Sequence, residues 1–130
     1  MRRSMVVALA ALSLLIAGSL IPGAAWAGDP EVKREGSCSG RSDWKLEVRL
    51  RDNNTFRVRW EADSGIAGQQ WQLELRRNGT LIASAVRTTN ADGEAQLRLR
   101  GVPNGTGTDT FAGFAENVAT GETCSGSASL

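Results

Sequence analysis

The sequence predicts an all-β protein, an antiparallel sandwich of seven strands preceded by a targeting segment. Apolar and polar residues alternate along most segments from residue 44 onward, as they do in strands with one buried and one solvated face. Turn-forming Gly, Asn and Asp recur roughly every ten residues, at the spacing of short sandwich strands. No comparable helical stripe of apolar residues follows residue 27.

Residues 1–27 have the features of a secretory signal peptide. Arg2 and Arg3 give a basic start, an apolar run extends to about Leu20, and Ala25-Trp26-Ala27 is a small-x-small cleavage site. A membrane anchor is the alternative, but the apolar run is short for a span and no basic cluster follows it. We therefore expect a secreted protein that meets a membrane only transiently, through this segment.

Residues 28–36 are polar and lack periodicity, so they are predicted to form a flexible N-terminal tail before a folded domain at residues 37–130. Cys38 and Cys124 are the only cysteines in the chain. In an exported protein an even number of cysteines indicates a disulfide, which here would join the two ends of the domain. A redox-active pair is not favoured, because the two residues do not form a Cys-x-x-Cys motif.

The strands are expected at regular intervals along the domain. They are predicted at residues 44–51, 56–62, 71–77, 80–86, 95–100, 109–118 and 122–130. The apolar residues of these strands define the core, with Trp60 at its centre. The core residues predicted with it are Val58, Trp71, Leu73 and Leu97.

The first hairpin turns at Asp52-Asn53-Asn54. Its apolar faces match when Leu50 lies opposite Phe56, since a slip of one residue would turn every side chain to the wrong face. The same register places Glu47 opposite Arg59 on the solvated face, and this opposite-charge pair independently favours it.

The second hairpin turns at Asn78-Gly79, a dipeptide typical of a type I′ turn. Regular pairing from this turn places Trp71 opposite Val86. It also turns Ala83 and Ala85 toward solvent.

Three segments resemble the fibronectin type III domain, an immunoglobulin-like sandwich. Phe56-Arg57-Val58-Arg59-Trp60 resembles its second strand with the buried Trp, and residues 71–75 lie where its third strand lies. Phe111–Asn117, followed by Gly121-Glu122, resembles its sixth strand. The resemblance covers about residues 44–130. It implies a seven-stranded immunoglobulin-like sandwich in which the first, second and fifth strands share a sheet.

The chain also departs from that family. It has no Tyr, and its cysteines lie at the ends of the domain, where typical members have no disulfide. These departures, with the Ala-, Gly- and Arg-rich composition, favour a broader immunoglobulin-like relative, as among small secreted proteins of high-GC Gram-positive bacteria. Because this fold hosts many activities, the resemblance does not name one.

The composition excludes several function classes. The chain has no His, which excludes Ser-His-Asp and Cys-His catalysis and His-ligated metals, and its net charge of +1 does not fit a nucleic-acid binder. Glu47 and Glu61 come nearest to a catalytic carboxylate pair, but the registers place both opposite basic residues. Asp52-Asn53-Asn54 and Asp109-Thr110 could offer oxygens to Ca²⁺, yet turn formation explains them. We predict no enzyme, no cofactor and no metal.

Two solvated sheet faces are the candidate sites. The sheet of the first, second and fifth strands is basic, and its arginines form a candidate face for an anionic ligand: Arg49, Arg51, Arg57, Arg59, Arg98 and Arg100. The other sheet carries Phe114, Val118 and Leu81 among polar residues, a candidate surface for a protein partner.

The sequence thus predicts a secreted, non-catalytic binding or structural module that acts through a sheet face at or outside the cell surface. Its expected partner is a protein or an anionic cell-envelope polymer. A small cell-wall or carbohydrate-binding protein is the alternative, and exposure of Trp44 or Trp71 would favour it. An enzyme or enzyme inhibitor would need a cleft or a rigid loop, for which residues 102–108 are the candidate.

Overall fold

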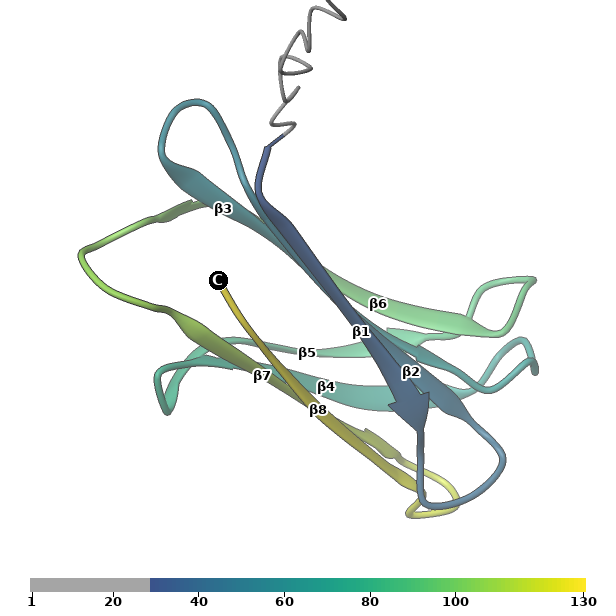
Figure 1. Cartoon of the computed structure of the whole chain (residues 1–130). Helices are drawn as coiled ribbons and strands as arrows, with labels where there is room; N and C mark the ends of the chain where they lie inside the picture. Colours follow the sequence, from purple (N-terminus) through teal and green to yellow (C-terminus); the bar gives the residue numbers. More distant parts are fainter. Residues whose placement is uncertain (1–28) are drawn as a thin grey trace, which may run out of the picture.

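The computed structural model describes residues 29–130, and the predicted signal peptide at 1–27 lies outside this range. Two four-stranded antiparallel sheets pack face to face (Figure 1). The eight strands are β1 (Glu31–Ser37), β2 (Asp43–Leu50), β3 (Thr55–Asp63), β4 (Gln70–Arg77), β5 (Thr80–Thr88), β6 (Glu94–Pro103), β7 (Thr110–Asn117) and β8 (Thr123–Ser129). The strand order is β1-β2-β3-β6 in one sheet and β5-β4-β7-β8 in the other. The predicted all-β immunoglobulin-like sandwich is confirmed, with β2, β3 and β6 in one sheet. Residues 29–130 contain no helix long and apolar enough to cross a membrane.

β1 corrects the predicted tail at residues 28–36, because Glu31–Ser37 pair with β2 along the whole length of the strand. The sandwich therefore has eight strands instead of seven. β1 is an edge strand exposed over most of both faces, so it shows no apolar alternation. Val32 alone packs a large apolar side chain from β1 against the core.

The core lies between the sheets and is centred on two Trp side chains. Trp60 and Trp71 are both fully buried, and Phe56 meets Phe111 edge to face at 5.3 Å between ring centroids. The other predicted core residues, Val58, Leu73 and Leu97, are also buried. A Cβ at Gly113 of β7 would lie 2.3 Å from the Trp60 ring, so only glycine leaves room for the indole there.

The first hairpin has the predicted register. Leu50 lies opposite Phe56 and Glu47 opposite Arg59. At the second turn, Asn78 and Gly79 have φ angles of 48° and 84°, the left-handed conformations that a type I′ turn requires.

The second hairpin departs from prediction at a β-bulge between Leu75 and Arg76. The bulge shifts the pairing by one residue, so Trp71 lies opposite Arg87 and the predicted Trp71–Val86 pair is wrong. The shift reverses the facing of β5: Ala83 and Ala85 pack against the core, whereas Val86 is 50% exposed.

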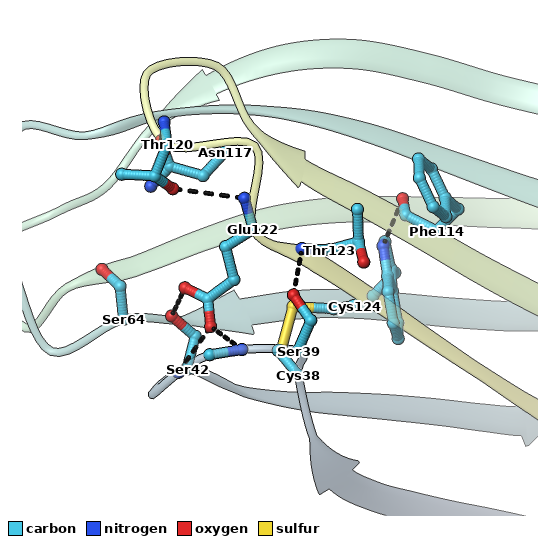
Figure 2. The surroundings of a disulfide bond; sticks show 12 residues. Cys38, Ser39, Ser42, Ser64, Phe114, Asn117, Thr120, Glu122, Thr123 and Cys124 are labelled. Carbon is cyan, nitrogen blue, oxygen red and sulfur yellow. Dashed lines mark hydrogen bonds between the residues drawn. A yellow bond between two sulfur atoms is a disulfide. The ribbon is translucent and has the colours of Figure 1, made fainter.

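Cys38 and Cys124 form the predicted disulfide, which ties the loop after β1 to β8 with 4.3 Å between the Cα atoms (Figure 2). Glu122 fastens the same loop, because its carboxylate accepts hydrogen bonds from the Gly40 and Ser42 amides, both at 2.9 Å, and from the Ser42 hydroxyl at 2.7 Å. The disulfide indicates an oxidising compartment.

Candidate functional site

The outer face of the β1-β2-β3-β6 sheet carries charge in rows that run across the strands. Its composition changes from basic to acidic along the strand direction. The pairing gives, in order, Glu31–Arg49–Arg57, Lys33–Glu47–Arg59–Arg98, Glu35–Lys45–Glu61–Gln96 and Ser37–Asp43–Asp63–Glu94. The six arginines predicted for an anionic ligand lie at the basic end of this face.

Three of these arginines are neutralised by carboxylates. Arg49 contacts Glu31 at 2.8 Å, and Arg51 contacts Asp29 at 3.7 Å. Arg59 lies 2.6 Å from a Glu61 oxygen and 3.9 Å from one of Glu47. The sequence prediction kept all six arginines in one group. It placed Asp29 and Glu31 in a flexible tail, and it expected Glu47 opposite Arg59 without excluding Arg59 from the group.

The other three arginines are Arg57, Arg98 and Arg100. Among residues 29–130, none of them has a carboxylate within salt-bridge distance. Arg98 donates from Nε to the amide oxygen of Gln96 at 3.1 Å. The arginines of this face that lack a carboxylate partner therefore lie on two neighbouring strands, β3 and β6.

A second β-bulge brings Arg57 against Arg100. The pairing of β3 with β6 shifts between Phe56 and Val58, so that Arg57 alone opposes Arg100 and Gly101. Gly101 supplies the left-handed φ of 69° that this bulge uses. Repulsion from Arg100, followed by partial burial, lowers the pKa of the Arg57 guanidinium.

Two surface hollows flank the Arg57 and Arg100 pair. The first, of about 360 Å³, lies toward the β2–β3 turn, with Arg51, Asn53 and Thr55 in its lining. The second, of about 180 Å³, lies toward the middle of the sheet, with Arg59 and Arg98 in its lining. Arg57 and Arg100 line both, so they form the wall between the hollows.

The acidic end of the same face brings together Glu61, Asp63 and Glu94, whose nearest carboxylate oxygens lie within 4.8 Å of one another. Burial raises the pKa of the Glu61 carboxyl, and repulsion from Glu94 raises it further. Attraction to Arg59 lowers it, but by less. One Glu61 oxygen already accepts hydrogen bonds from Arg59 at 2.6 Å and Gln96 at 3.1 Å. These are the carboxylates best placed to hold a cation, and the sequence reasoning missed Asp63 and Glu94.

The residues considered for Ca²⁺ have other partners. Asp109 is buried, and its Oδ1 accepts hydrogen bonds from Arg77 Nε at 2.9 Å and Asn78 Nδ2 at 3.2 Å. The Arg77 bond is the main reason that the pKa of Asp109 lies below its usual range, despite burial. Asn54 adopts a left-handed φ of 58° and the Asn53 side chain accepts a hydrogen bond from Thr55, as expected of a turn.

The apolar residues proposed as a partner surface are exposed but separated. Phe114 is 38% exposed on β7, Leu81 is 45% exposed on β5, and Val118 follows β7 with 58% exposed. β4 lies between β5 and β7, and its Glu74 and Arg76 pair with the strands on both sides. The three side chains therefore do not join into one apolar patch. Ala83 and Ala85, which were expected to face solvent beside them, pack against the core because of the bulge in β5.

The Trp residues bear on the carbohydrate alternative. Trp71 is fully buried, which excludes it from stacking against a sugar. Trp44 is half-buried, and its ring lies 5.7 Å from that of Trp60. A Cβ on Gly126 would lie 2.3 Å from the Trp44 ring, so β8 covers part of this indole closely.

Comparison with known proteins gives no family. No protein-family description and no curated protein matches the chain. Among solved structures it is similar to the CARDB domain of a Pyrococcus furiosus protein, solved in complex with di-metal ions. The identity is 11% over 78% of this chain and 92% of that domain, with a TM-score of 0.39. At this level of similarity, nothing of that domain's metal binding transfers to the chain.

Proposed function

We propose that the protein is a secreted, non-catalytic binding module that holds an anionic polymer of the cell envelope against the outer face of the β1-β2-β3-β6 sheet. One observation carries the proposal. Arg57, Arg98 and Arg100 lie together on β3 and β6, and no carboxylate of residues 29–130 neutralises them. A planar guanidinium binds phosphate, sulfate or carboxylate groups through two parallel hydrogen bonds.

The arrangement has an electrostatic cost that an anion would remove. Like charges placed opposite each other on neighbouring strands destabilise a sheet. Arg57 lies opposite Arg49 on β2 and beside Arg100 on β6, and only Arg49 has a carboxylate partner among the described residues. A bound anion would replace repulsion between Arg57 and Arg100 with two attractive contacts.

Location and chemistry support an extracellular anion instead of a reaction. The disulfide fits an oxidising compartment, as does the signal-peptide pattern of residues 1–27. The chain has no His, and the most buried carboxylate of the face, Glu61, is held by Arg59 and Gln96. Binding through fixed positive charge requires no further group.

The test compares two variants with the same change in charge. In one, Arg57, Arg98 and Arg100 are replaced by Ser. In the control, the exposed Arg41, Arg76 and Arg87, which lie away from the unpaired cluster, are replaced instead. Binding is measured on dextran sulfate and long-chain polyphosphate, with neutral dextran as the uncharged reference.

The proposal expects the first variant to bind roughly tenfold or more weakly, and the salt dependence of binding to decrease by about one unit of slope for each arginine–anion pair that is removed. The control variant should bind like the unaltered protein. Equal weakening in both variants, or equally tight binding of neutral dextran, would overturn the proposal.

A second candidate function is contact with a protein partner through the other sheet. The supporting observation is the exposure of Phe114 on β7, a central strand of its sheet. Aromatic side chains are enriched at protein interfaces. The polar residues of β4 divide this surface, so the arginine face is the better supported of the two.

A further inference from the structure

The two hollows beside Arg57 and Arg100 have no other arginine in common. The lining of the first hollow includes Arg51, whereas the arginines of the second are Arg49, Arg59 and Arg98. We propose that the hollows are two successive subsites for neighbouring anionic groups of one extended chain, which makes the ligand a linear polymer with repeated phosphate or sulfate groups. This inference rests on the proposed function and specifies its ligand.

The position of the shared pair is the first argument. An anion in one hollow contacts Arg57 and Arg100 from one side only, and leaves their other sides facing the second hollow. Two anions, one in each hollow, surround the pair. Because the guanidinium has five donors in a planar fork, each arginine can contact both anions at once.

The spacing of the strands is the second argument. Arg57 and Arg59 are two residues apart on β3, which corresponds to about 7 Å along a strand. Arg98 lies opposite Arg59, and Arg100 lies two residues further along β6. The four side chains thus form two steps of a track along the strands, with neighbouring strands about 5 Å apart. A flexible chain with charged groups at regular intervals can follow such a track, whereas a single small anion occupies one step.

The linings of the hollows differ in a way that a polymer can use. The first hollow adds the Asn53 amide, the Thr55 hydroxyl and the Asp52 carboxylate to its arginines, so it can bind an anionic group together with hydroxyls of a linker, which can donate to Asp52. In the second, Glu31 neutralises Arg49, and Glu61 and Glu47 neutralise Arg59. Apart from the shared pair, Arg98 therefore supplies the free charge. Arg51 and Arg98 are therefore the residues that distinguish the two subsites.

The experiment measures chain-length dependence by isothermal titration calorimetry at fixed low salt. The probes are orthophosphate, tripolyphosphate and long-chain polyphosphate. A glycerol-linked phosphodiester polymer and dextran sulfate, compared at matched length, distinguish the possible sources of the charge. The variants are Arg51→Ser for the first hollow, Arg98→Ser for the second and Arg87→Ser as the matched control on β5.

Two linked subsites predict an affinity gain of roughly a hundredfold from orthophosphate to a chain long enough to fill both. Arg51→Ser and Arg98→Ser should each remove most of this gain while orthophosphate binding through the remaining hollow persists. Arg87→Ser should leave the gain unchanged.

Three outcomes would overturn the inference. If affinity per anionic group does not rise with chain length, or if Arg51→Ser behaves like Arg87→Ser, there is a single subsite, and the proposed function still stands. Both proposals fail if the unaltered protein binds every anionic probe no more tightly than the variant in which Arg57, Arg98 and Arg100 are replaced by Ser.

Discussion

The indole Nε1 of Trp60, on β3, donates a hydrogen bond of 3.0 Å to the backbone carbonyl of Phe114, on β7, and so connects the two sheets through the middle of the core. The contact depends on Gly113, because the indole lies over the position that a Cβ there would fill. The aromatic ring of Phe114 meanwhile lies on the outer side of its sheet, 38% of the residue being exposed.

The first prediction concerns this contact. Gly113→Ala places a methyl group against the Trp60 ring and should lower the free energy of unfolding by about 1–3 kcal/mol, the usual cost of overpacking. Gly105→Ala is the control, since nothing lies within 4 Å of its Cβ position. Urea unfolding measures both. A Gly113→Ala protein as stable as Gly105→Ala would show that Trp60 does not occupy this position.

The second prediction concerns the disulfide. The bridge links residues separated by 86 positions and restricts the unfolded chain strongly. Replacing both Cys38 and Cys124 by Ser should lower the free energy of unfolding by about 2–5 kcal/mol. Non-reducing mass spectrometry of the unaltered protein should find no free thiol. Two free thiols in the unaltered protein would contradict the pairing.

The third prediction concerns the pH dependence of stability through Glu122. Burial raises the pKa of this carboxyl. Hydrogen bonds from the Ser42 hydroxyl and from the Ser42 and Gly40 amides lower it by more, so the pKa lies below its usual value of 4.5. A carboxyl with a lower pKa in the folded state stabilises the fold above the pKa of the unfolded chain, and this contribution is lost as pH falls through the folded value.

Replacing Glu122 by Gln should therefore cost stability at pH 7, with a deficit that narrows below about pH 4.5. Thermal unfolding at a series of pH values measures this, with Glu116→Gln on the exposed face of β7 as the control. A Glu122→Gln deficit that is constant from pH 7 to pH 3 would show that ionisation of Glu122 is not responsible.

The first hairpin shows how much of the fold could be predicted from the sequence. Apolar matching and charge matching agree there, so Leu50–Phe56 and Glu47–Arg59 could both be placed. β5 could not be placed beyond its turn, because both parities of the strand carry apolar residues, Ala83 and Ala85 on one and Ile82 and Val86 on the other. Nothing in the sequence marks the bulge at Leu75. A single inserted residue then reverses the facing of the strand.

β1 was missed because apolar alternation is absent from an edge strand that is exposed on most of both faces. Its charges nevertheless held a signal: Glu31, Lys33 and Glu35 lie opposite Arg49, Glu47 and Lys45.

The arginine face could be predicted as a group, because its arginines alternate with apolar residues along the strands. The same alternation predicted the strands themselves. The three unpaired members could not be singled out, because that depends on Glu31, on Asp29 and on the bulge beside Arg57.

The fourth prediction uses β1 to increase binding. Glu31 neutralises Arg49 at 2.8 Å and also contacts Lys33 at 3.6 Å. Glu31→Gln frees both cations, of which Arg49 lines the second hollow, so the affinity for long-chain polyphosphate should rise several-fold at low salt and less at high salt. Glu116→Gln, with the same charge change on the other sheet, should have a smaller effect. A weaker affinity after Glu31→Gln would mean that Glu31 orients Arg49 for the ligand instead of competing with it.

The last prediction separates the two sheet faces. Because Phe114 is partly exposed, Phe114→Ser should keep the fold and change the free energy of unfolding by less than about 1 kcal/mol. Its ring lies on the sheet opposite the arginine face, so dextran sulfate binding should be unchanged. Binding through the arginines should also weaken steeply as ionic strength rises, whereas an apolar contact through Phe114 should persist.

The outcomes can therefore be assigned to one face or the other. Loss of polyanion binding in Phe114→Ser, with the fold retained, would place the ligand on the β5-β4-β7-β8 sheet and contradict the arginine site. Unfolding of Phe114→Ser would mean that the ring belongs to the core, and the candidate protein-contact surface would then be abandoned. Salt-resistant binding that survives replacement of Arg57, Arg98 and Arg100 but not of Phe114 would make the apolar surface the functional one.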